Sequence, residues 1–109
     1  MDFLHDEIKN KAIKICTGEL AWNYSDIVSI MKMLYKNEFV ILGGDVINND
    51  LSYTYDNWYY DYNYSLSYEE NVKLGFNRSI EYVRNYHVKF GDMFYYVIVY
   101  MDKGTVLPS

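Results

Sequence analysis

Acidic and aromatic side chains are concentrated in the middle of the chain, where their types and spacing suit either catalysis or binding. The stretch from Asn37 to Val72 contains no Lys or Arg but holds seven acidic residues and seven tyrosines. The acidic residues of this stretch are Glu38, Asp45, Asp50, Asp56, Asp61, Glu69 and Glu70.

Carboxylates in pairs can act as general acid and general base. Asp45, Asp56 and Asp61 could form such a pair, and His87 could serve as a base. No nucleophile, phosphate-binding loop or known catalytic spacing accompanies them. Solvated or turn-capping acids and a histidine at a helix end explain the same residues. We therefore predict that the chain is not an enzyme, and a small carboxylate-dependent enzyme is the alternative.

Metal and cofactor sites are not indicated by the spacing of possible ligands. His5, Cys16 and His87 are scattered and lack the paired spacing of a zinc site. The Asn48–Asp50 segment is too short to supply the roughly six oxygens that calcium requires. Gly43-Gly44-Asp45 lacks the following helix N-terminus of a phosphate-binding loop. The sequence predicts no metal and no cofactor.

A binding face for a basic partner is the interpretation that the aromatic residues favour. Tyr and Trp dominate the residues that hold interfaces together, and their rings attract Lys and Arg. We expect about half of the tyrosines from Tyr53 to Tyr68 to pack in the core or at the sheet edge. The residues predicted to bind the partner are Asp45, Asp56, Trp58, Tyr59, Tyr60, Asp61 and Tyr62.

The overall composition narrows the class of partner and the compartment. A formal net charge of −5 disfavours nucleic acid and anionic membranes, which attract basic proteins. The lone Cys16 excludes a disulfide framework and favours a reducing compartment. The charged N-terminus does not resemble a signal peptide, and no window approaches the roughly 18 apolar residues of a membrane span. We expect a cytoplasmic protein with a single domain over residues 1–109.

Three stretches carry apolar residues at helical spacing. The first covers residues 2–15, although the alternation of residues 12–16 would also suit an edge strand. The second begins at Ser25, a favourable N-cap, and the third begins at a capping box of Ser67 and Glu70. Their expected buried stripes are Leu4, Ile8, Ala12 and Ile15; Ile27, Ile30, Met31 and Leu34; and Val72, Phe76, Ile80 and Val83, extending to Tyr86 or His87.

Three other stretches have the composition of strands. The run from Phe39 to Ile47 is continuously apolar, which predicts a central strand covered on both faces. Gly43-Gly44 within it costs about 1 kcal/mol per glycine, so we expect a bulge or a close backbone approach there. A second strand begins near Leu51, and its aromatic residues change phase at Asp56-Asn57, which predicts a bulge or break. A third strand runs from Met93 to Met101.

The predicted fold is α+β, with the element order α-α-β-β-α-β. If the last strand pairs beside the first, the three strands form an antiparallel sheet of order 2-1-3. The acidic and aromatic strand then lies at an edge of the sheet, next to the apolar strand.

Several short motifs resemble the immunity protein 40 family of bacterial polymorphic toxin and contact-dependent growth inhibition systems. They are FVILGGDVI, the acidic and aromatic YDNWYYD, and SIEYVRNYH before the strand YYVIVY. The resemblance extends over roughly residues 20–101. The run of tyrosines from Tyr59 to Tyr64 is heavier than is typical of that family.

The resemblance implies a small, cytosolic, non-catalytic protein that binds the C-terminal toxin domain of its own system. Many such toxins are nucleases with basic clefts, which an acidic face can occupy. A peptide-binding or ligand-binding module without a toxin is a further alternative.

Overall fold

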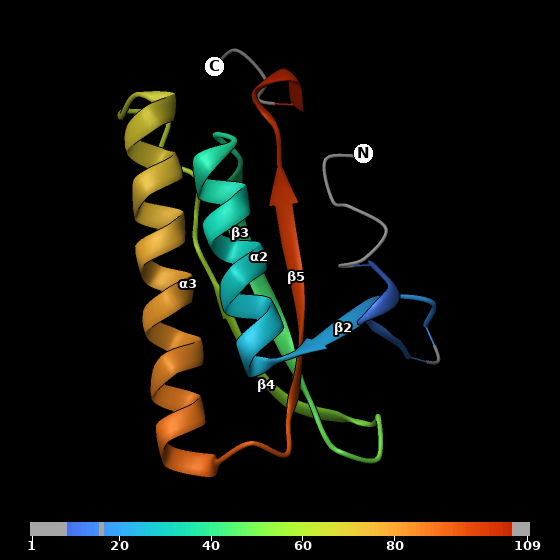
Figure 1. Cartoon of the computed structure of the whole chain (residues 1–109). Helices are drawn as coiled ribbons and strands as arrows, with labels where there is room; N and C mark the ends of the chain where they lie inside the picture. The colour runs from blue at the N-terminus through green and yellow to red at the C-terminus, as the bar shows by residue number, and fades with distance from the viewer. Residues whose placement is uncertain (1–8, 16, 106–109) are drawn as a thin grey trace.

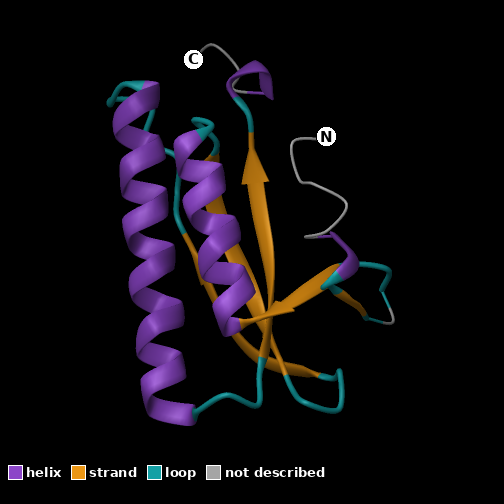
Figure 2. Cartoon of the chain, viewed as in Figure 1, coloured by secondary structure: helices purple, strands orange, loops and turns teal. Residues whose placement is uncertain are grey.

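The computed structural model describes residues 9–15 and 17–105. Its described residues form two helices that lie on the same side of a five-stranded antiparallel sheet of order β1-β2-β5-β3-β4 (Figures 1 and 2). The elements along the chain are β1 (Ile13–Lys14), β2 (Leu20–Asn23), α2 (Tyr24–Lys36), β3 (Val40–Ile47), β4 (Tyr53–Tyr59), α3 (Tyr68–Phe90), β5 (Tyr95–Met101) and the 3-10 turn η1 (Lys103–Thr105).

The predicted three-stranded sheet and its element order are wrong, because two additional strands precede α2. Within the five-stranded sheet, β3 does lie between β4 and β5, and β4 is an edge strand. β2 is 4 residues long, too short to produce an alternating pattern that can be recognised in the sequence. Pairing of β2 with β5, more than 70 residues later, creates this part of the sheet.

The first predicted helix, residues 2–15, falls partly outside the described residues. Within the described residues, Lys9 and Asn10 are helical, whereas Ile13–Lys14 forms the edge strand β1, which pairs with β2. The alternation of residues 12–16, which suited an edge strand as well as a helix, was therefore the informative signal.

β3 is the central strand that its apolar run predicts. Val40, Ile41, Val46 and Ile47 are fully buried. Ile41 and Val46 belong to the core beneath the helices, whereas Ile47 packs on the opposite face of the sheet in a smaller cluster with Ile15, Ala21 and Val97. The continuous apolar run therefore reflects cover on both faces.

The glycine pair in β3 produces both features that the sequence predicts. The register with β5 shifts between Ile41 and Gly43, and Gly43 has φ 148. A Cβ on Gly44 would collide with the carbonyl oxygen of Val97 and with the ring of Trp58. Glycine is required because the backbone of β5 and this ring approach the strand so closely.

β4 is irregular near the predicted phase change. Its register with β3 shifts between Asn57 and Tyr53, and Tyr55 between them has φ 69. This irregularity turns the ring of Trp58 toward the helices and leaves its neighbour Tyr59 on the opposite face.

The structure confirms most of the buried stripes and one of the two N-terminal caps that the sequence predicts for α2 and α3. α2 buries Ile27, Ile30, Met31 and Leu34 as expected, but Asn23 caps it in place of Ser25, accepting a hydrogen bond from the backbone N–H of Asp26. α3 begins with both hydrogen bonds of the predicted capping box. Its predicted stripe is buried except for Phe76, which is half-buried.

α3 also buries small and polar residues that the apolar stripe does not include: Asn71, Gly75 and Ser79. A Cβ on Gly75 would lie 2.6 Å from the carbonyl oxygen of Ile41, so the helix is in close contact with β3. Neither α2 nor α3 is both long and apolar enough to span a bilayer, as judged over the described residues.

Candidate functional site

The structure divides the seven predicted binding residues among three places. Asp45 and Tyr59 lie on the face of the sheet away from the helices. Asp56 and Trp58 point from β4 toward α3. Tyr60, Asp61 and Tyr62 belong to the segment that joins β4 to α3. They follow one another along the hairpin but do not form one continuous patch.

Trp58 is a core residue. Its side chain is 2% exposed, its indole N–H donates a hydrogen bond to Ser79 Oγ at 2.9 Å, and its ring stacks on Tyr82 with centroids 5.1 Å apart. Ser79 in turn donates to the backbone carbonyl of Gly75 at 2.7 Å. Trp58 therefore holds the edge strand β4 against α3. Because the indole ring is buried in this contact, it is not available to a partner.

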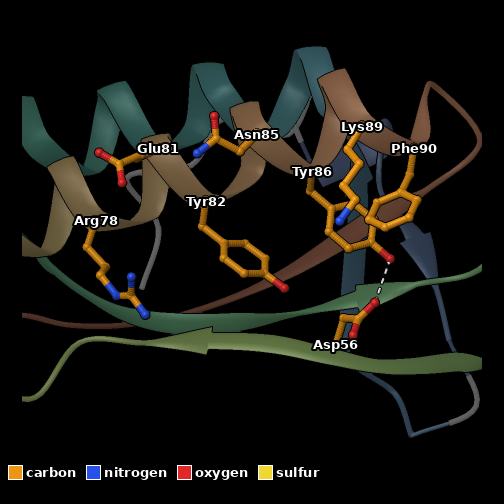
Figure 3. A pocket seen from close by; sticks show the side chains of 8 residues that line it. All are labelled: Asp56, Arg78, Glu81, Tyr82, Asn85, Tyr86, Lys89 and Phe90. Atoms are coloured by element: carbon orange, nitrogen blue, oxygen red, sulfur yellow. Dashed lines mark hydrogen bonds between the residues drawn. The ribbon is translucent and has the colours of Figure 1, made fainter.

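A cleft of about 380 Å³ separates β4 from the outer side of α3 (Figure 3). Asp56 extends from β4 into this α3/β4 cleft and accepts a hydrogen bond from the hydroxyl of Tyr86 at 2.9 Å. Arg78 donates from Nε to the backbone carbonyl of Tyr59 at 3.1 Å. The cleft lining contains two acids and two bases and is completed by aromatic and amide side chains: Asp56, Arg78, Glu81, Tyr82, Asn85, Tyr86, Lys89 and Phe90.

The hydroxyl of Tyr86 is strongly affected by this environment. Burial, and next the hydrogen bond to the Asp56 carboxylate, raise the pKa of Tyr86 to about 12. Both causes favour the neutral phenol, which can donate to the carboxylate, over the phenolate. Tyr86 is thus a stable donor at neutral pH that holds Asp56 against the helix.

A second depression, of about 250 Å³, lies on the helix-free face of the sheet. We name it the glycine groove because Gly43 and Gly44 are among the residues that line it. Tyr59 and Val99 beside it are 64% and 47% exposed. The residues that line the groove are Leu42, Gly43, Gly44, Asp45, Asn57, Trp58, Tyr59 and Val99.

Asp45 supplies the charge of the glycine groove. It stands in register between Asn57 of β4 and Val97 of β5, and its side chain is half-buried. Burial, and then the nearby carboxylate of Glu19, raise the pKa of Asp45 above its usual range. Glu19 itself accepts a hydrogen bond from the hydroxyl of Tyr53 at 2.7 Å.

The segment after β4 is held by a residue that sequence reasoning missed. Asn71 is completely buried; its amide oxygen accepts from the Tyr60 hydroxyl and the Asn63 backbone N–H, and its amide nitrogen donates to the carbonyls of Asn63 and Ser67. The signal available in the sequence was an asparagine next to the predicted apolar stripe of α3. Four hydrogen bonds to one buried side chain make it an anchor for the loop.

The remaining predicted residues of this segment are more accessible. Asp61 is exposed, and the half-buried Tyr62 packs near Tyr64 and Tyr68 with centroids 4.8 and 6.5 Å away. Tyr68 donates from its hydroxyl to the carbonyl of Glu38 at 2.6 Å. Burial, together with the acidic and tyrosine groups nearby, raises the pKa of Tyr68 to about 12.

The candidate catalytic groups do not converge on one centre. Asp45 lies in the glycine groove, whereas Asp56 faces α3 on the other side of the sheet. His87 stacks on Tyr24 with centroids 3.9 Å apart, and its Nε2 lies 3.2 Å from Asp92 Oδ1. The part of the chain that the structure describes holds no group of three or more His, Cys, Asp or Glu arranged to hold a metal ion.

Comparison with known proteins adds a family relationship to this geometry. The family model described as Immunity protein 40 matches residues 10–100, most of the chain. Comparisons with curated proteins and with solved structures found no match.

Proposed function

The chain belongs to the immunity protein 40 family, and on this premise we propose that it binds a cognate toxin domain and blocks it without catalysing a reaction. The match over residues 10–100 is the observation that carries this proposal, because it includes α2, α3 and the five strands except for Met101 at the end of β5. The expected setting is the bacterial cytoplasm, in a polymorphic toxin or contact-dependent growth inhibition system, where the partner is the toxin's C-terminal domain.

We propose further that the toxin domain is basic, as expected of a nuclease. The chain has a formal net charge of −5, and the stretch from Asn37 to Val72 contains no Lys or Arg. Nucleases bind a polyanion, so their substrate clefts carry positive charge that an acidic face complements. Complementary charge accelerates association and disfavours wrong partners.

The proposed contacts are the more accessible members of the predicted set, which lie on both sides of the edge strand β4 and in the segment after it: Asp45, Asp56, Tyr59, Asp61 and Tyr62. Trp58 and Tyr60 support this surface from beneath, through their bonds to Ser79 and Asn71 of α3. The exposed acids supply charge, and Tyr59 supplies an aromatic contact area that loses little conformational entropy on binding.

A binding series with the purified toxin domain tests the proposed function. We expect a stable one-to-one complex whose association slows as salt is added, because exposed charges are screened. The combined variant Asp45→Asn, Asp56→Asn and Asp61→Asn should associate more slowly and protect cells poorly. Lys32→Gln on the exposed side of α2 is the control and should bind as the unaltered protein does. Absence of any complex between the unaltered protein and the toxin domain would contradict the proposal.

The non-catalytic part of the proposal has its own test. The purified protein should turn over no nucleic acid, ester or glycoside substrate. Activity that Asp56→Asn or Asp61→Asn removes, but that other surface variants retain, would favour the carboxylate-dependent enzyme instead.

A further inference from the structure

We propose that the glycine groove receives a Lys or Arg side chain of the toxin, with Asp45 as its charge partner and Tyr59 and Val99 as its walls. This inference rests on the proposed function and names the chemical contact within it. The groove is one part of the helix-free sheet face, and the occupant is one basic side chain of the partner.

The shape of the groove follows from the strand pairing. Both helices cover the opposite face (Figure 1), and on this face Ile15 and Ala21 cover Ile47 and Val97. That cover does not extend over Val99, which is 47% exposed. Gly43 lies between Val99 and Tyr59 in register, and a Cβ on it would collide with the backbone carbonyl of Trp58, so only backbone lies between these two side chains. The result is a depression with an apolar wall on each side of a bare backbone floor.

The charge of the groove is not compensated within the described residues. No Lys or Arg is among the causes that shift the pKa of Asp45, which are burial and the Glu19 carboxylate. Glu19 itself accepts hydrogen bonds from the hydroxyls of Thr17, at 3.1 Å, and Tyr53, at 2.7 Å. Burial and the Glu19 carboxylate both raise the pKa of Asp45, so ionisation of this side chain is less favourable in the folded protein than in the unfolded chain. A cation placed beside Asp45 would remove this unfavourable interaction.

A basic side chain fits both features. Lys and Arg carry an apolar stem that can lie along Val99 and a charged end that can approach a carboxylate and an aromatic ring. An acidic side chain would be repelled by Asp45. An apolar side chain would bury the carboxylate without a partner, which is strongly unfavourable.

The α3/β4 cleft is less suited to a cation, although it is larger. It contains Arg78 and Lys89 of the chain itself beside Asp56 and Glu81. Its charges are balanced, and the Asp56 carboxylate already accepts a hydrogen bond from Tyr86. Charge complementarity therefore favours the glycine groove.

The decisive experiment measures affinity for the toxin domain and thermal stability in the same variants. Asp45→Asn should weaken binding about tenfold or more, as expected for truncation of one partner of a buried charge pair, and its Tm should be unchanged or higher. Asp92→Asn removes the same charge from a side chain that is 85% exposed and lies outside the groove and the proposed contacts, so it is the matched control and should bind nearly as tightly as the unaltered protein.

A second variant closes the groove without altering Asp45. Val99→Lys places a cation of the chain itself beside Asp45, so it should abolish toxin binding in a folded protein. Val88→Lys is its control, because Val88 is an exposed valine on α3 and the change in net charge is the same. Scanning the Lys and Arg residues of the toxin should identify one whose Ala variant loses no further affinity when combined with Asp45→Asn.

The outcomes separate the two proposals. If the unaltered protein forms no complex with the toxin, the proposed function fails. If it does form the complex while Asp45→Asn and Val99→Lys bind as tightly as their controls, the proposed function stands and the groove is not the contact. A toxin scan in which no basic residue couples to Asp45 would also overturn the inference.

Discussion

At the scale of single residues, chemical type alone does not reveal whether an aromatic side chain faces a partner or the core. Tryptophan is a residue type that commonly anchors interfaces. In this fold, however, the ring of Trp58 is buried against Tyr82 and its indole N–H donates a hydrogen bond to Ser79. Tyr59, its neighbour in sequence, is 64% exposed on the other face of the sheet. Adjacent residues of one strand point to opposite faces, so a change of phase by one residue exchanges their roles.

Replacing Trp58 tests this assignment. Trp58→Phe removes the indole N–H that donates a hydrogen bond to Ser79 Oγ, and the smaller ring leaves a cavity in the core. We therefore expect a loss of about 1–3 kcal/mol in the free energy of unfolding. Affinity for the toxin should change little in the folded variant. Urea unfolding and a binding titration provide the two measurements. A large loss of affinity at unchanged stability would instead show that Trp58 contributes to the binding surface.

A second prediction concerns a buried hydroxyl. Tyr96 is fully buried, and among the described residues its hydroxyl has no hydrogen-bond partner. Tyr96→Phe should therefore leave stability unchanged or raise it by about 1 kcal/mol, because an unsatisfied buried polar group is unfavourable. Tyr86→Phe is the matched comparison and should destabilise, because it removes the hydrogen bond to Asp56. A clear loss of Tm in Tyr96→Phe would show that this hydroxyl has a partner in solution.

At the scale of elements, small residues control how closely α3 and the strands approach one another. Gly75 and Ser79 are buried on the side of α3 that faces the sheet, with the indole of Trp58 reaching Ser79. Gly44 of β3 makes room for the same indole ring. The position of the edge strand β4 therefore depends on a contact between one large ring and several residues with small side chains.

Gly75→Ala tests this packing. Alanine favours a helix over glycine by about 1 kcal/mol, which alone would stabilise α3. The new Cβ would lie 2.6 Å from the carbonyl oxygen of Ile41, so overpacking should dominate and the net change should be a loss of about 1–3 kcal/mol. The exposed position Asn77 on the same helix is the control, and Asn77→Ala should have little effect. An increase in stability for Gly75→Ala in urea unfolding would mean that α3 can move away from β3.

At the scale of the whole molecule, tyrosines are distributed among the core, the edge strand and the loop before α3. Burial and neighbouring acids raise the pKa of both Tyr68 and Tyr86 to about 12, compared with 10.0 for the free side chain. The folded state therefore retains these two protons over a pH range in which the unfolded chain releases them.

This difference predicts alkaline instability. The contribution of the two phenols to stability is fully present below pH 10, where folded and unfolded chains are both protonated, and is lost as the pH rises toward about 12. Thermal unfolding measured between pH 8 and pH 12 should show a Tm that decreases above pH 10. Tyr86→Phe should make the decrease less steep. A Tm independent of pH in this range would show that the two hydroxyls are not held in their neutral form.

Local patterns in the sequence determined the parts of this protein that short-range interactions control. The capping box at Ser67 and Glu70, the buried stripe of α2 and the apolar run of β3 depend on residues close together in the chain, so they were predictable. The irregularity of β4 was visible in the phase of its aromatic residues. The motifs between Phe39 and Tyr100 also indicated the family that the match over residues 10–100 establishes.

The tertiary structure decided the features that depend on contacts between distant segments. Ile13–Lys14 and Leu20–Asn23 become strands because β5, far along the chain, offers an edge for β2 to pair with. The orientation of Trp58 depends on Ser79, 21 residues away. The glycine groove exists because three separate strands bring Val99, Gly43 and Tyr59 into one row. Strand register sets these neighbours, and it is a long-range property that no single segment contains.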